Sequence, residues 1–337
     1  RHPDGRVSRV TINANGWNST KPRYEPARAP GRLRIAVIGD SYVHASYVDT
    51  NAAFPEILEE RLRQRGIDAE VLRFGMDGAP LSQYLYMLRK EVVALKPDIV
   101  LVQLIHNDFD ESYRFLKTRY ASSFLKVDVD EQASVSEFPP ADFVPASADL
   151  LRSSATFRYL YYETNLYLIS KSLVSRYFWG GTESYDPKFI VSAVDTRNLG
   201  DMPRMDRVTA HVIGEMKTLA DRHGIKLALA MDGVRETIYG RNDSGTEILL
   251  RLNAMAAGAA QIAHVPFLDL TNTFARDYAR SQLRFEYPYD WHWNARTNRL
   301  VGETLADWML ADPRLLGRAH PAAQSVSDPR DALGGRS

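Results

Sequence analysis

The chain has 337 residues, of which 45% are hydrophobic, and this is enough to bury a large core in one domain or two. Lysine plus arginine and aspartate plus glutamate both number 42, so no net charge favours nucleic acid or an anionic membrane surface as a partner. The chain has no cysteine, which excludes disulfides, thiolate nucleophiles and cysteine-ligated zinc.

No run approaches the roughly 20 apolar residues that a membrane-spanning helix needs, so we expect no transmembrane segment. The chain begins RHPDGR and not with methionine, which we interpret as a removed leader or a shortened chain.

Five short apolar runs predict strands that are covered on both faces, because the runs are continuous and do not alternate with polar residues. The predicted strands are 34–38, 69–74, 98–104, 225–231 and 265–270. Helical patterns follow at 53–65, 81–95, 205–223, 247–263 and 294–310. This alternation predicts βαβ units, a parallel sheet and right-handed crossovers.

One long interval breaks the rhythm, because no core strand is predicted between residues 109 and 205. Within it, aromatic and aliphatic residues from Ala155 to Tyr177 recur at spacings of three and four, which predicts a long helix. This stripe either packs the insertion onto the main domain or forms a cap that lines a substrate groove. We therefore expect an N-terminal lead-in (1–33), a main domain (34–311) with an insertion at about 109–205, and a flexible tail (312–337).

Ser41 directly follows the first predicted strand, in the sequence Gly39-Asp40-Ser41. The carboxyl edge of a parallel sheet is where ligands bind, and helix N-terminal amides there stabilise negative charge. This position suits a nucleophile, although Gly-Asp-Ser is also ordinary turn chemistry and serine is a common N-cap. Asp40 is expected to fix the turn that holds Ser41.

A serine nucleophile needs a base to take its proton and a group to orient that base. Of the eight histidines, His292 has the most distinctive setting, because it precedes the last predicted helix and has Asp290 two residues upstream. The alternative interpretation is a capping aspartate and a packed histidine between Trp291 and Trp293.

Acyl transfer also needs donors that stabilise an oxyanion. Gly78 follows the second predicted strand and lets the backbone N–H approach a ligand closely. Asn107 follows the third strand and offers a side-chain amide. Both residues also have plain turn explanations.

Four blocks, taken in chain order, resemble the SGNH or GDSL-type hydrolases: GDS at 39–41, Gly78, HND at 106–108 and DWH at 290–292. The resemblance covers about residues 35–310. It implies a three-layer α/β/α sandwich around a five-stranded parallel sheet, flavodoxin-like in strand order, with a large helical insertion after the third strand.

The resemblance also implies roles for individual residues. Ser41 corresponds to the nucleophile, with its N–H in the oxyanion hole together with Gly78 N–H and the Asn107 side chain. His292 corresponds to the general base and acid, oriented by Asp290, and no metal or organic cofactor is expected.

Two blocks depart from the family pattern. Ile105 replaces the glycine of Gly-x-Asn-Asp, which puts the local backbone course in question. The last block is Asp-x-His where the family usually has Asp-x-x-His, with Tyr289 three residues before the histidine. The shorter spacing also resembles the Asp-x-His-Trp pattern of bacterial polysaccharide O-acetyltransferases, which keeps acyl transfer open.

The sequence therefore predicts a serine ester hydrolase that removes a short, acetyl-like acyl group from an alcohol or sugar hydroxyl. The alternatives are an O-acyltransferase that acts on a glycan and a catalytically silent module that binds a glycan or a protein. Neither a G-x-G-x-x-G nor a Walker sequence follows the first strand, and the G-x-S-x-G elbow is missing around Ser41.

The expected substrate is a small-molecule or glycan acyl ester, and many relatives lie outside the cytoplasm, so we expect a periplasmic or extracellular location. The oligomeric state is not predicted. Residues expected to border the substrate are Asp40, His44, His106, Trp291 and Trp293, the two tryptophans by stacking on a sugar.

Overall fold

The computed structural model describes residues 6–114, 123–141, 154–156, 199–287 and 290–316. Its centre is a five-stranded sheet in which each strand is parallel to its neighbours, with the order β2-β1-β3-β6-β7. When these five strands are numbered one to five along the chain, the order is 2-1-3-4-5, which is that of flavodoxin-like folds. The strands are β1 (Leu33–Gly39), β2 (Ala69–Gly75), β3 (Ile99–Leu104), β6 (Lys226–Met231) and β7 (Phe267–Asp269). All five predicted strands and the α/β fold class are confirmed.

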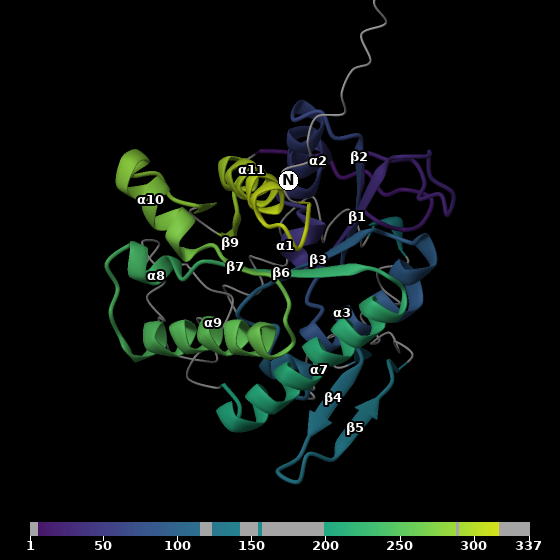
Figure 1. Cartoon of the computed structure of the whole chain (residues 1–337). Helices are drawn as coiled ribbons and strands as arrows, with labels where there is room; N and C mark the ends of the chain where they lie inside the picture. Colours follow the sequence, from purple (N-terminus) through teal and green to yellow (C-terminus); the bar gives the residue numbers. More distant parts are fainter. Residues whose placement is uncertain (1–5, 115–122, 142–153, 157–198, 288–289, 317–337) are drawn as a thin grey trace, which may run out of the picture.

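Helices cover both faces of this sheet and make three layers (Figure 1). In β1, Ala36 and Ile38 pack with the helices of one face, whereas Ile35 and Val37 pack with those of the other. The first face carries α3 (Leu81–Met87), α7 (Met202–Arg222) and α9 (Ser244–Ile262). The second carries α2 (Phe54–Gln64), α10 (Thr271–Ser281) and α11 (Ala295–Ala311). Because both faces are covered, the strands show continuous apolar runs.

Several short elements were not predicted. The helix expected over 81–95 is α-helical only in α3 and continues as a π-helical turn, Leu88–Val92, and a 3₁₀ turn, Val93–Leu95. The helix α10, of which only Thr273 and Phe274 are buried, was also missed. The short helix α8 (Arg235–Ile238) and the antiparallel pair β8 (Glu286–Tyr287) and β9 (Asp290–Trp293) are too short for such a signal.

The interval after β3 contains β4 (Lys126–Val129) and β5 (Val135–Phe138), which form a separate antiparallel hairpin beside α7. In Figure 1 this hairpin projects away from the central sheet. Within the described part of the interval, as predicted, no strand joins the central sheet. The long aromatic helix predicted from Ala155 lies, apart from its first two residues, outside the described residues.

Both predicted end segments take part in packing. Tyr24 of the lead-in is buried, and its hydroxyl donates to the carbonyl of Arg73 in β2 at 2.9 Å. Leu315, assigned above to the flexible tail, is fully buried against the core beside α11. The residues just after α11 therefore pack on the second face through this apolar side chain, and the flexible tail stays a prediction for residues 317–337, which lie outside the described residues. Among the described residues, no helix is long and apolar enough to cross a membrane.

Candidate active site

Ser41 begins a one-turn helix, α1 (Ser41–His44), directly after β1. Asp40 caps this turn, since its Oδ1 accepts a hydrogen bond from the N–H of Tyr42 at 2.9 Å. Gly75, at the end of β2, lies so close to α1 that a Cβ there would come within 2.0 Å of the backbone nitrogen of His44. The glycine therefore allows the turn that carries Ser41 to lie directly against the carboxyl edge of the sheet.

His292 and Asp290 lie on β9, and the fold brings them to Ser41 across 251 positions of sequence. The Nε2 of His292 is 2.7 Å from Ser41 Oγ, and its Nδ1 contacts Asp290 Oδ1. The same carboxylate oxygen accepts the backbone N–H of His292 at 2.7 Å. An ionised carboxylate only accepts hydrogen bonds, so Nδ1 carries the proton and Nε2 is left to accept from the serine hydroxyl. The three side chains form one hydrogen-bonded series.

Asp290 remains ionised although it is largely buried. Burial alone would raise the pKa of its carboxyl. Hydrogen bonds and charge from His292, together with a hydrogen bond from Tyr47, outweigh burial and place the pKa of Asp290 below its ordinary value. A charged Asp290 can stabilise an imidazolium at His292.

Two tyrosines from the segment that carries Ser41 surround the imidazole of His292. The ring of Tyr47 stacks on it with centroids 4.3 Å apart and an angle of 16° between the planes. The ring of Tyr42 lies on it with a centroid distance of 5.0 Å and a tilt of 38°. No family block includes Tyr47, and sequence reasoning missed it, because its contact with His292 depends on how the loop after α1 folds back.

Asp40 is buried directly beneath the nucleophile. Its Oδ2 is 3.3 Å from Ser41 Oγ, a longer contact than the one to His292, so the serine proton is shared with Nε2 in preference. Burial raises the pKa of Asp40 to about 6, against the opposing effects of the Tyr42 N–H and the charge of His292. As predicted, this carboxyl fixes the turn.

The expected oxyanion donors lie on the turns that follow β1, β2 and β3. The N–H of Ser41 is the first of α1 and, like the N–H of Gly78, donates no hydrogen bond within the described part of the chain. Gly78 has a φ of +68°, in the left-handed region that favours glycine. Two backbone donors are thus available on neighbouring turns of the same sheet edge.

The third block is held by its aspartate. Asp108 Oδ2 accepts the N–H of Ile105 at 2.8 Å, and Oδ1 accepts the hydroxyl of Tyr84 at 2.8 Å. Ile105 is buried and does not have a positive φ, so this turn needs no glycine there. Asn107 is partly exposed, and its Oδ1 is a buried atom without a hydrogen bond among the described residues.

The residues expected to border the substrate differ in their exposure. Trp291 is 38% exposed, and its ring lies beside that of His292 with centroids 5.8 Å apart. His44 is partly exposed and contacts Asp77 through Nδ1 at 2.7 Å, which links α1 to the turn that carries Gly78. In contrast, Asp40, His106 and Trp293 are buried, so in this structure their side chains pack behind the exposed residues of the site.

His106 and Trp293 have internal surroundings that fit this supporting position. Burial lowers the pKa of His106 to about 3, so its imidazole is neutral. The indole N–H of Trp293 donates to Asp232 at 3.1 Å, and its ring packs edge-on against Tyr42. Within the described part of the chain, no group of three or more metal-binding side chains comes together, at His44 and His106 or elsewhere.

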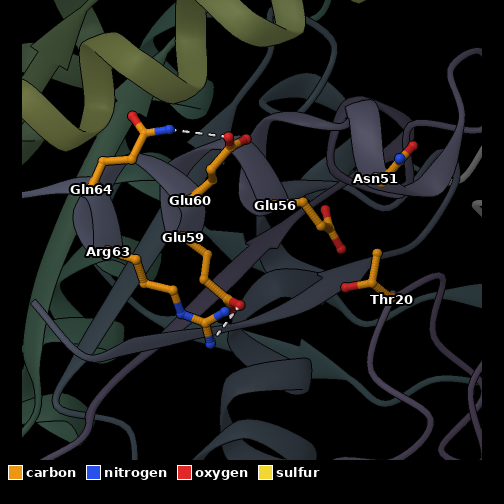
Figure 2. A pocket seen from close by; sticks show the side chains of 7 residues that line it. All are labelled: Thr20, Asn51, Glu56, Glu59, Glu60, Arg63 and Gln64. Carbon is orange, nitrogen blue, oxygen red and sulfur yellow. Dashed lines mark hydrogen bonds and ion pairs between the residues drawn. The ribbon is translucent and has the colours of Figure 1, made fainter.

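A surface pocket lies on α2, and none of the predicted site residues lines it (Figure 2). Its carboxylates are engaged: Glu59 pairs with Arg63 at 2.9 Å and with Lys21 at 2.5 Å. The lining residues are Thr20, Asn51, Glu56, Glu59, Glu60, Arg63 and Gln64. We assign this pocket no part in the chemistry at Ser41.

A serine, a histidine and an aspartate in hydrogen-bonded series at the carboxyl edge of a flavodoxin-like sheet define an α/β protein with the constellation of a serine hydrolase. Residues 35–141 match the model of a family described as GDSL-like Lipase/Acylhydrolase, which confirms the resemblance over this segment. The matched segment contains Ser41, Gly78 and Asn107 but ends before Asp290 and His292. No curated protein matches the chain.

Solved structures with a similar course include the following three, each of low identity. An acetyl xylan esterase is 11% identical with a TM-score of 0.45, over 82% of this chain and 99% of that one. A two-domain esterase active on acetylated mannans is 11% identical with a TM-score of 0.44, over 82% of this chain and 48% of that one. A protein of the G-D-S-L family from Desulfitobacterium hafniense DCB-2 is 13% identical with a TM-score of 0.42, over 82% of this chain and 98% of that one.

Proposed function

We propose that this protein is a serine ester hydrolase that removes a short acyl group from an alcohol or a sugar hydroxyl through an acyl-enzyme on Ser41. The observation that carries the proposal is the distance of 2.7 Å between Ser41 Oγ and His292 Nε2, with Asp290 bound to the opposite ring nitrogen. A serine hydroxyl becomes an effective nucleophile when a positioned base takes its proton.

In the acylation step, Ser41 Oγ attacks the ester carbonyl carbon while its proton passes to His292 Nε2. The tetrahedral oxyanion accepts hydrogen bonds from the N–H groups of Ser41 and Gly78 and from the Asn107 amide. When the intermediate collapses, the bond between the carbonyl carbon and the alcohol oxygen breaks, and His292 returns the proton to that oxygen.

In the deacylation step, water takes the place of the alcohol. His292 removes a proton from the water, the resulting nucleophile attacks the acyl carbon, and the proton returns to Ser41 Oγ as the carboxylic acid leaves. Asp290 stays ionised throughout and stabilises the imidazolium. Trp291, partly exposed beside the base, offers an aromatic face on which a sugar ring of the alcohol part can stack.

The test is hydrolysis of p-nitrophenyl acetate, butyrate and octanoate, with intact mass measured after treatment with an organophosphonate. Ser41→Ala should lose turnover and the adduct. Ser46→Ala is the matched control, because Ser46 accepts a hydrogen bond from Ser8 through its backbone carbonyl, which alanine keeps. A preference for acetate would support a short acyl group. If the folded native protein shows neither turnover nor adduct, a binding function replaces the proposal.

A second candidate is O-acyl transfer to a glycan, and the short Asp-Trp-His-Trp spacing on β9 is the observation that favours it. The acyl-enzyme is the same, and a glycan hydroxyl replaces water in the second step. Adding acetyl-acceptor oligosaccharides should then accelerate p-nitrophenol release and yield an acylated sugar by mass spectrometry. Release that is unchanged, with acetate as the product, favours hydrolysis.

A further inference from the structure

Arg235 is a fully buried cation at the start of α8, just below the residues proposed for catalysis. Its Nη1 donates to the backbone carbonyl of Trp291 at 2.8 Å, and its Nη2 donates to the hydroxyl of Tyr42 at 3.0 Å. The Tyr42 hydroxyl donates in turn to the same Trp291 carbonyl at 2.8 Å. The three groups close a small hydrogen-bonded ring.

The position of this ring in the sequence gives it its significance. Tyr42 follows Ser41 directly, and Trp291 stands between Asp290 and His292. The ring therefore connects the backbone of the nucleophile turn to the backbone of β9, one residue away from each reacting side chain. β9 belongs to a two-stranded hairpin outside the central sheet, so no backbone hydrogen bonds of that sheet hold it in place. The contacts of the ring hold β9 instead.

Buried carboxylates hold the guanidinium in place. Asp232 accepts from Arg235 at 3.1 Å through Oδ2, and its Oδ1 accepts the indole N–H of Trp293 on β9 at 3.1 Å. Glu286 on β8 lies 3.4 Å from the guanidinium. Arg235 thus touches or neighbours both strands of the hairpin. Charge-assisted hydrogen bonds of this kind are stronger and more directional than neutral ones.

The titration of these groups agrees with the geometry. Burial alone would lower the pKa of Arg235, but the carboxylates of Asp232 and Glu286 and the Tyr42 oxygen raise it well above its ordinary value. Burial raises the pKa of the Tyr42 hydroxyl, which keeps its proton available to Trp291. The ring therefore stays fully hydrogen-bonded at neutral pH.

We propose that Tyr42 and Arg235 are positioning residues that set the distance between Ser41 Oγ and His292 Nε2 by tying α1 to β9. The inference rests on the proposed ester chemistry. A displacement of about 1 Å of a catalytic group costs about a hundredfold in rate, whereas substrate binding through other contacts is unaffected. Loss of the ring should therefore lower kcat and leave KM nearly unchanged.

The sharpest variant is Tyr42→Phe, which removes one hydroxyl and keeps the ring that packs on His292 and Trp293. Its matched control is Tyr24→Phe, which also removes a buried hydroxyl bonded to backbone, at β2. We expect Tyr42→Phe to lower kcat by about tenfold to a hundredfold with KM within about threefold, while Tyr24→Phe leaves kcat within about twofold. Arg235→Lys, which keeps the charge but loses the two-armed fork, should retain more activity than Arg235→Gln.

A second readout does not depend on turnover. The proton between His292 Nδ1 and Asp290 is followed by NMR on ¹⁵N-histidine-labelled protein and assigned by its loss in His292→Gln. Tyr42→Phe should shift or broaden this signal, and Tyr24→Phe should not. The proposal is overturned if Tyr42→Phe matches the control in both kcat and the NMR signal. If the native protein turns over no ester, the proposed function fails, and the NMR comparison alone decides the positioning role.

Discussion

Replacing Asp40 with asparagine should make the protein more stable, and increasingly so as the pH rises. Asp40 is buried, and its pKa of about 6 lies above its ordinary value of 3.8. Between these two pH values the folded protein holds a proton that the unfolded chain has released. Because the folded state binds more protons there, stability falls as the pH rises through this window.

The magnitude follows from the two pKa values. The difference between about 6 and 3.8, at about 1.36 kcal/mol for each pH unit, is about 3 kcal/mol of folding free energy lost above the folded pKa. Between pH 5 and pH 8 the native protein should lose on the order of 1 kcal/mol from this group. The asparagine of the variant cannot ionise, and its side-chain oxygen still accepts the Tyr42 N–H that caps α1.

The assay is urea unfolding of the native protein and Asp40→Asn at pH 5 and pH 8. The result is how much the difference in free energy of unfolding between the two proteins changes from pH 5 to pH 8. Any constant effect of the substitution cancels in that comparison. Ser46→Ala serves as the control, since it removes a hydroxyl from the loop after α1 and keeps the Asp40 carboxyl and its Ser41 contact, so its pH dependence should follow the native protein. A stability difference between Asp40→Asn and native protein that is equal at both pH values refutes the reasoning.

Two further predictions concern the base. Asp290→Asn removes the carboxylate that bonds His292 Nδ1. We expect kcat/KM to fall by about 10²- to 10⁴-fold at neutral pH, with the intact mass of the variant confirming that Ser41 is unchanged. Equal activity of Asp290→Asn and native protein would show that another group orients the base. Tyr47→Phe keeps the stack on His292 and loses the hydroxyl bond to Asp290, so kcat should fall only a few-fold. Tyr47→Leu also loses the stack, which should raise the activation free energy by about 1 kcal/mol and so lower kcat about fivefold further in steady-state kinetics. Identical rates for the two variants would exclude a role for the ring.

The central sheet was predictable because β1, β2, β3 and β6 are largely buried on both faces and therefore appear as apolar runs. The hairpin of β8 and β9 was not, since a two-residue strand such as Glu286–Tyr287 has no periodicity to detect. The short helix α1 was visible only through its cap, Asp40, and the position of Ser41 after β1. Local patterns thus predicted the scaffold but not the small elements that carry the base.

The site divides in the same way. Ser41 and His292 belong to blocks whose residue types have a direct chemical meaning, so their proximity could be predicted before the structure. Tyr47 and Arg235 could not, because an isolated tyrosine or arginine has no motif and its partner is fixed only by tertiary contacts. For Trp293 the sequence suggested too much. Its place beside the histidine suggested stacking on a sugar, but its side chain is buried in this structure.

The charges around Ser41 bear on which esters the site accepts. Asp40 is 3.3 Å from the nucleophilic oxygen, Asp290 is ionised behind the base, and Asp77 lies exposed at the rim against His44. The cation Arg235 is buried beneath the site and is offset by Asp232 and Glu286, so it offers no open anion contact. Among the described residues, an anionic acyl group or alcohol would therefore approach these carboxylates, whereas a neutral ester would meet the proposed oxyanion donors without this repulsion. Negative charge develops in the transition state alone, where these donors are already oriented, and this favours an uncharged acyl ester as the substrate.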